Sequence, residues 1–193
     1  MLSPEVVLLA GIFPIAVHAL SLNITAVTTN GTGASIFECW SLRAPLKGST
    51  QPGTVGAVSS FLGDVANMTY SVQPAGFNGG NHNTPYNQQV GPSLLRYHCI
   101  GLLGTNTNHD SDGILTLPDN PAAGFYAMRD MPSGIFFAAD TADLSHAGHG
   151  SVFPGYTSTI FLQIPTLDNK VPEHTVLHAG VCTAKDIIGL NTL

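Results

Sequence analysis

The chain has 193 residues, 44% of them hydrophobic, a length that allows one substantial core and is short for two domains. Only 9% of the residues are charged, whereas typical soluble proteins have about 25%. With a formal net charge of −6 and no cluster of Lys or Arg, the sequence argues against nucleic acid or an anionic membrane as a partner. Sparse charge among many Ser, Thr, Asn and Gly residues suits an extracellular protein that sugars keep soluble.

Residues 1–19 are predicted to be a cleaved signal peptide. The stretch VVLLAGIFPIAVHAL is apolar, is interrupted by Pro14, and ends in the small-x-small motif Val17-His18-Ala19. It is shorter than the roughly 20 residues that a membrane-spanning helix needs, although an anchored helix is the alternative. Cleavage would leave residues 20–193 as a secreted, extracellular protein without a membrane span.

Three Asn-x-Thr sequons follow, at Asn23, Asn30 and Asn67. Behind a signal peptide, each of these asparagines is a candidate for N-glycosylation. Residues 20–33 are therefore interpreted as a glycosylated N-terminal segment that precedes the folded domain.

The three cysteines are Cys39, Cys99 and Cys182. In an oxidising compartment two of them are expected to pair. Cys39 with Cys182 is the favoured disulfide, because the first and last strands of closed β-domains commonly lie side by side. The alternative is that all three are buried thiols.

Short runs with β character recur along the chain between Gly, Pro and Asn residues, and convincing helices are scarce. The run GIFFAAD is continuously apolar, so it is predicted to lie at the centre of the core. Strands at short spacing with turns between them indicate an all-β sandwich or barrel. The predicted strands cover 34–42, 55–63, 66–74, 113–118, 124–128, 134–140, 156–165 and 174–182, and the stretch 87–112 fits this pattern poorly.

The spacing around His82 resembles the first motif of the metal-binding double-stranded β-helix proteins, the cupins. That motif has a Gly, five residues, a His-x-His pair and then a Glu, and Gly76 with His82 matches its beginning. The position of the second histidine is occupied by Thr84, and the position of the Glu falls on Gln88 or Gln89.

A second cupin motif has a Gly, five residues and a Pro, which Gly148 and Pro154 reproduce, while its ligand histidine falls on Thr159. A transition-metal ion needs several His, Cys or carboxylate ligands, so one imidazole among neutral side chains is a feeble site. The standard cupin metal centre is therefore expected to be absent, and no cofactor is predicted.

If acid–base chemistry occurs, His82 is the first candidate for a catalytic residue, because an imidazole on a loop at a barrel mouth can transfer a proton without a metal. A histidine satisfied by its own polar loop is the alternative. Thr84, Tyr86, Gln88 and Thr159 are the predicted pocket residues around it.

A different metal site stays open as an alternative, formed by His82 with His174 and His178. The last two are four residues apart on one face of a strand or helix, with Glu173 beside them. An ordinary hydrogen-bonded surface histidine is the competing interpretation for each, as it is for His146 and His149 on the Gly-rich stretch SHAGHGS. Acidic residues in predicted loops are interpreted as turn formers, namely Asp110, Asp112, Asp119 and Asp130.

Three stretches together, SFLGDVANMTYSVQPAGFNGGNHNTP, GIFFAADTADLSHAGHGSVFPG and STIFLQIPTLDNKVPEHTVLHAGVC, resemble a family of small secreted fungal proteins with a cupin-like, RmlC-type jelly roll. The resemblance covers most of residues 34–182 and implies secretion and a single cupin-like β-barrel. From their sequence alone, the last residues, 183–193, are interpreted as a tail. It implies no settled activity.

Three functions remain in view. The first is binding of a small organic molecule, such as a fungal secondary metabolite, with metal-free isomerase, dehydratase or cyclase chemistry. The second is a non-catalytic cell-wall or host-interaction protein, and the third is a diverged metal-dependent cupin oxygenase. A homodimer is left open, and the fold alone does not choose among these functions.

Overall fold

The computed structural model describes residues 20–86, 88–92, 113–127, 135–156 and 158–187. The predicted all-β fold is confirmed, because the described residues form strands and two short 3-10 helices, η3 (Leu167–Asn169) and η4 (Ala184–Ile187). No helix within these ranges is long and apolar enough to cross a membrane. The predicted signal peptide and Cys99 lie outside the described residues.

The larger of two main sheets has seven strands, whose neighbouring pairs are antiparallel except for β1 with β10. This pairing brings the N-terminal strands beside the C-terminal one. The spatial order is β13 (His174–Ala179), β2 (Ser35–Pro45), β1 (Ser21–Thr29), β10 (Phe136–Ala138), β7 (Gln88–Pro92), β12 (Thr159–Pro165) and β5 (Thr69–Gln73).

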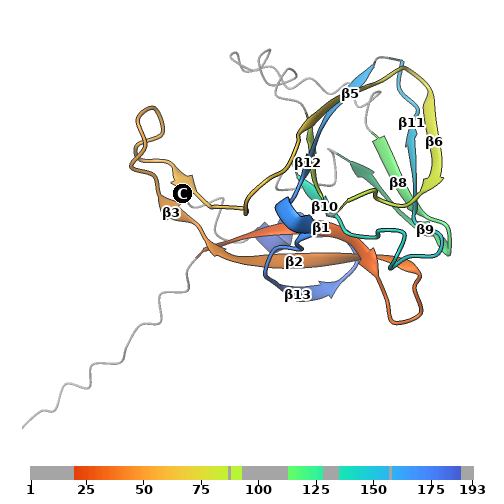
Figure 1. Ribbon diagram of the computed structural model, residues 1–193, viewed down its shortest axis with the longest axis horizontal. Helices are drawn as coiled ribbons and strands as arrows, with labels where there is room; N and C mark the ends of the chain where they lie inside the picture. The colour runs from red at the N-terminus through yellow and green to blue at the C-terminus, as the bar shows by residue number, and fades with distance from the viewer. Residues whose placement is uncertain (1–19, 87, 93–112, 128–134, 157, 188–193) are drawn as a thin grey trace, which may run out of the picture.

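The smaller main sheet has four antiparallel strands, and Figure 1 shows it on one side of the molecule. A separate two-stranded hairpin projects from the opposite side (Figure 1) and consists of β3 (Lys47–Gly48) and β4 (Val58–Ser59). In spatial order the four strands are β6 (Phe77–His82), β11 (His149–Phe153), β8 (Gly113–Leu117) and β9 (Asn120–Ala127).

The centre of the larger sheet is buried on both faces. Phe136 and Ala138 of β10 belong to a core cluster with Phe153 of the smaller sheet. Phe137, between them in sequence, packs on the opposite face against Trp40, with ring centroids 5.7 Å apart. The prediction that GIFFAAD lies at the centre of the core is confirmed, and burial on both faces explains why its apolar residues do not alternate with polar ones.

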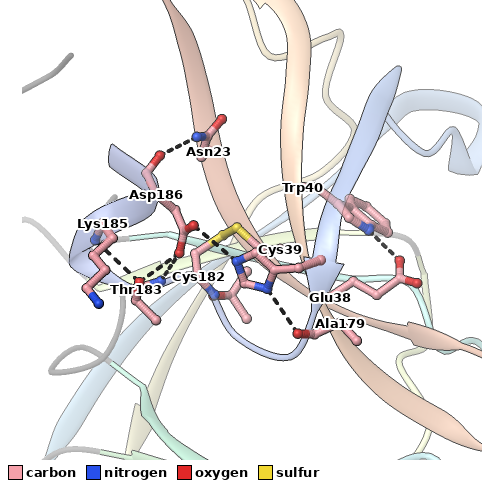
Figure 2. The surroundings of a disulfide bond; sticks show 11 residues. Asn23, Glu38, Cys39, Trp40, Ala179, Cys182, Thr183, Lys185 and Asp186 are labelled. Atoms are coloured by element: carbon pink, nitrogen blue, oxygen red, sulfur yellow. Dashed lines mark hydrogen bonds and ion pairs between the residues drawn. A yellow bond between two sulfur atoms is a disulfide. The ribbon is translucent and has the colours of Figure 1, made fainter. Parts of the chain in front are cut away.

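The predicted disulfide between Cys39 and Cys182 is confirmed (Figure 2). Cys39 lies on β2 and is paired in register with His178 of β13, while Cys182 follows the end of β13. Both cysteines are buried, and the Cys182 N–H donates to the Thr25 hydroxyl at 3.0 Å. The bond therefore fixes the chain just after β13 to the neighbouring strand β2.

Some element boundaries differ from the predicted ones. Residues 21–29 were predicted to precede the domain but form β1. Residues 24–27 of this strand are buried and pack on both faces of the sheet, so the sequence lacks the apolar–polar alternation that identifies a strand. The predicted tail begins with η4, which contacts β1 through a hydrogen bond from the Asn23 amide to the Asp186 carbonyl. Of the predicted strand 55–63, only Val58–Ser59 has strand conformation.

Candidate functional site

A cavity of about 380 Å³ lies between the two main sheets. Aromatic and aliphatic side chains form one part of its wall, and two imidazoles, three glutamine amides and two hydroxyl groups form the rest. No Asp, Glu, Lys or Arg occurs among the described residues that line it. The lining side chains come from β5, β6, β7, β8, β10, β11 and β12 and from the residues that follow β6.

Two histidines meet at the polar end of the cavity. His82 ends β6 and lies directly opposite His149, the first residue of β11, with ring centroids 4.7 Å apart and planes inclined by 55°. The two strands approach closely here because residue 148 is glycine. A Cβ at Gly148 would lie 2.1 Å from the His82 carbonyl oxygen, and its φ of +65° also favours glycine.

A β-bulge on β6 decides which side chains face the cavity. Ser151 pairs with Gly80 and Val152 with Asn78, so Gly79 is the extra residue. A Cβ at Gly79 would lie 2.7 Å from the Ser151 hydroxyl, and Gly80 has a φ of +61°. Strict alternation would send two side chains five positions apart to opposite faces, yet Phe77 and His82 both line the cavity.

His149 is held by a buried carboxylate. Its Nδ1 lies 2.8 Å from Oδ2 of Asp140, a residue that is 0% exposed. Asp140 also accepts from the Ser35 hydroxyl at 3.0 Å and from the Thr84 hydroxyl at 2.9 Å. Because an ionised carboxylate only accepts, the hydrogen of the neutral His149 ring is on Nδ1, and Nε2 keeps its lone pair.

Further hydrogen bonds fix the segment that carries this pair. The Ser145 hydroxyl is 2.7 Å from that of Ser35 and accepts from the Gly148 N–H at 2.9 Å. The Asn83 amide donates to the carbonyls of Ser145 and Asp140, at 2.8 and 3.3 Å. The carboxylate, the imidazole and the end of β6 are therefore positioned as one hydrogen-bonded unit.

His82 is oriented differently, by its own strand. Its Nδ1 lies 3.2 Å from the Gly80 carbonyl oxygen, which only accepts, so Nδ1 carries the hydrogen and Nε2 has the free lone pair. Partial desolvation at the cavity lowers the pKa of His82 below 6.5, and a positive charge on a protonated His149 would lower it further, against the opposing effects of the Gly80 carbonyl and Asp140. His82 is therefore an uncharged base at neutral pH.

The predicted pocket residues divide into two groups. Thr84 and Gln88 are buried and line the cavity, and Thr84 also holds Asp140. Tyr86 is 59% exposed and Thr159 is buried, and neither belongs to the cavity lining.

The histidines of the alternative metal set do not come together. His82 lies in the smaller sheet, whereas His174 and His178 lie on β13, at the far edge of the larger one. His174 stacks on Trp40 with ring centroids 3.7 Å apart. His178 Nε2 is 3.1 Å from the Asp186 carboxylate.

His178 and Asp186 also lie close to Cys39, with potential ligand atoms of the three residues within 4.8 Å of one another. The sulfur of Cys39 is committed to the disulfide, so it is no thiolate ligand here. Two hydrogen bonds raise the pKa of His178 above 6.5: the larger effect is that of the Ala179 carbonyl, and the second is that of the Asp186 carboxylate. This arrangement is consistent with a pair of surface charges beside the disulfide.

Sequence reasoning missed Asp140, Ser35 and the role of His149. The sequence does contain a signal for Asp140. Its carboxylate directly follows the apolar run IFFAA, and an acidic residue at the end of a core strand is either buried with partners or turned outward to solvent. His149 was assigned to a loop together with His146. The structure separates them, since His146 lies outside the cavity lining, 3.4 Å from the Asp119 carboxylate, and is exposed.

Comparison with known protein families, curated proteins and solved structures gives no match to this chain.

Proposed function

We propose that this chain is a secreted, cupin-like jelly-roll protein that binds a small organic molecule in the cavity between its sheets. We propose further that His149 and His82 transfer protons on that molecule without a metal. The reaction class is that of an isomerase, dehydratase or cyclase, in which protons move while no electrons are supplied.

The observation that carries this proposal is the buried His149–Asp140 pair at the cavity wall. A carboxylate behind an imidazole fixes its tautomer and stabilises the imidazolium that forms when Nε2 takes up a proton. Burial of both groups away from water strengthens this effect. A purely structural role for His149 would not explain why its ring, with Nε2 free of a partner among the described residues, lines an open cavity.

His82 complements His149. Both rings have Nδ1 engaged and Nε2 free, and both line the same cavity. One imidazole can therefore remove a proton from the bound molecule while the other, once protonated, returns a proton elsewhere on it. Because the pKa of His82 is lowered, its protonated ring gives up the proton more readily than an ordinary imidazolium does.

The donor set of the cavity supports acid–base chemistry over metal chemistry. Its described lining contributes two imidazoles and otherwise neutral amides, hydroxyls and hydrocarbon. Catalytic zinc sites commonly use three protein ligands, and the non-haem iron site adds a carboxylate to two histidines. Asp140 is held behind the ring of His149 by Ser35 and Thr84.

The proposal is tested with 5-nitrobenzisoxazole, a neutral aromatic compound that reports on any base in an apolar pocket. A base removes the ring C–H proton, the electron pair forms a nitrile, and the N–O bond breaks to release a coloured phenolate. The full secreted chain, treated with a chelator, should form the phenolate faster than free imidazole does. His149→Gln should slow the reaction by about 100-fold, the scale of general-base catalysis.

Two matched variants connect the activity to the cavity. Gln73→Trp fills the cavity from β5 and should abolish turnover, whereas Val72→Trp, on the outer face of the same strand, should retain it. If His149→Gln fails to fold, His82→Gln replaces it as the test of proton transfer, because the exposed His82 side chain can be changed without disturbing the core. Unchanged turnover in His149→Gln would refute the catalytic role, and turnover that a chelator removes and added metal restores would favour the oxygenase alternative.

A further inference from the structure

We infer that the molecule bound in the cavity is a neutral one- or two-ring compound that carries a hydroxyl group and, apart from it, a carbonyl or ether oxygen. This inference rests on the proposed function of the cavity as a binding site. It narrows the occupant from small organic molecules in general to one pattern of charge, donors and acceptors.

The absence of charge on the described cavity wall excludes ionic ligands. An anion such as a carboxylate or a phosphate would lose its water and meet no Lys or Arg there. It would also lie near Asp140, behind His149. A cation would find that carboxylate already occupied by three donors.

One side of the cavity is lined by glutamine amides. Gln73 and Gln163 come from neighbouring strands, β5 and β12, and Gln88 from β7. Strand β5 is reversed in polarity, because Tyr70 and Val72 point outward, 51% and 52% exposed, while Gln73 points inward. A cavity for a pure hydrocarbon would favour the opposite orientation of this strand.

The amide of Gln163 is oriented. The Ser71 hydroxyl donates to its Oε1 at 2.7 Å, which leaves its NH₂ group to donate toward the cavity. A ligand oxygen with a lone pair, such as a carbonyl or ether oxygen, satisfies this donor. An apolar ligand would leave this donor covered and without a partner, which is unfavourable.

The histidine end has the opposite requirement. Nε2 of His82 and of His149 are both acceptors when the rings are neutral. A hydroxyl group on the ligand is the donor that matches them, and its proton is then in place for transfer. The ligand must therefore donate at the histidines and accept at Gln163.

The remaining wall fits a ring. Phe77 and Phe153 lie at 40° with centroids 6.1 Å apart, and Phe136 and Ile114 extend the apolar surface. Aromatic faces of this kind stack on a flat or half-flat ring. A volume of about 380 Å³ is near the lower end of the range for ligand pockets, which limits the occupant to one or two rings.

Binding of matched probes to the isotope-labelled full chain, followed by NMR titration, tests the inference. The three hydroxyacetophenone isomers carry both groups, acetophenone lacks the hydroxyl, ethylphenol lacks the carbonyl, and hydroxybenzoate adds a negative charge. At neutral pH at least one hydroxyacetophenone should bind about fivefold or more tightly than acetophenone and ethylphenol, the scale of one hydrogen bond. Hydroxybenzoate should bind at least about tenfold more weakly than that isomer.

A pair of glutamine variants locates the recognition. Gln163→Leu should remove the advantage of hydroxyacetophenone over ethylphenol and leave ethylphenol binding unchanged. Gln51→Leu, in the exposed turn of the β3–β4 hairpin, should change neither. If Gln163→Leu reduces binding of both probes equally, the oriented amide is not the discriminating group and the inference fails.

Failure of this inference differs from failure of the proposed function. Equal or tighter binding of hydroxybenzoate, or no binding of any probe, overturns the ligand class, while turnover of 5-nitrobenzisoxazole that depends on His149 keeps the proposed function. Loss of that dependence overturns the proposed function, whichever probe binds.

Discussion

The Cys39–Cys182 disulfide should contribute a large share of the free energy of unfolding. The two residues are 143 positions apart, and for a loop of this length the chain-entropy relation gives about 5 kcal/mol. Disulfides commonly deliver less, so we expect about 2–5 kcal/mol. With a urea m-value of about 2 kcal/mol/M, the unfolding midpoint should fall by about 1–2.5 M when the bond is broken.

The comparison is made in a Cys99→Ala background, so that no third thiol can exchange with the pair. Urea unfolding of the oxidised protein is compared with that of the same protein under a reductant, which changes the bond and no other atom of the core. Cys39→Ala/Cys182→Ala serves as a second measure, and its midpoint should lie up to about 1 M lower still, because the two lost sulfurs each leave a void at about 1 kcal/mol. Alanine is used because the hydroxyl of serine would be buried at these positions.

A midpoint shift below about 0.5 M between the oxidised and reduced forms would refute this reasoning. It would mean that the unfolded chain gains little freedom when the bond opens, so that the entropy of a long loop is not what the bond controls.

Two further predictions concern protonation and glycosylation. Because the pKa of His82 is lowered from 6.5, its contribution to stability is present above pH 6.5 and is lost as the pH falls below it. Wild type should therefore lose more stability on acidification than His82→Gln in urea titrations, and the opposite order would contradict the assignment. In a eukaryotic secreting host, Asn30→Gln should remove one glycan by mass spectrometry, because Asn30 is exposed and its bonds to Thr32 and Ala34 use Oδ1. Asn23→Gln should leave the mass of the attached sugar unchanged, since Asn23 Nδ2 donates to the Asp186 carbonyl and its Oδ1 is buried; a lost glycan there would show that this contact forms after the sugar is attached.

The fold was predictable where side chains alternate or cluster. The β class, the central position of GIFFAAD and the disulfide all follow from hydrophobic runs and cysteine placement. The two strands that carry the histidine pair, β6 and β11, were not predicted. Their sequences, FNGGNH and HGSVF, contain glycines and polar residues that are typical of turns, and the strand conformation comes from pairing across the sheet.

The part of the candidate site that lies within one stretch of sequence was predictable, and the part that depends on strand pairing was not. His82 attracted attention through its spacing from Gly76, and Thr84 and Gln88 through their positions in the same motif. The partners Asp140 and His149 lie about 60 residues further along the chain. They are brought to His82 by the pairing of β11 with β6 and by the bridge between Thr84 and Thr141. No local pattern contains that information.

The single surplus residue in β6 has a consequence for how this chain can vary. Successive side chains on a strand point to opposite faces of the sheet. Whether the number of residues between Phe77 and His82 is odd or even therefore decides whether the aromatic ring and the imidazole face the same cavity. Removing Gly79 would turn one of them out into solvent even though every chemical group were kept. Insertions and deletions in this stretch are therefore tolerable only two at a time, whatever the lengths of the loops at either end.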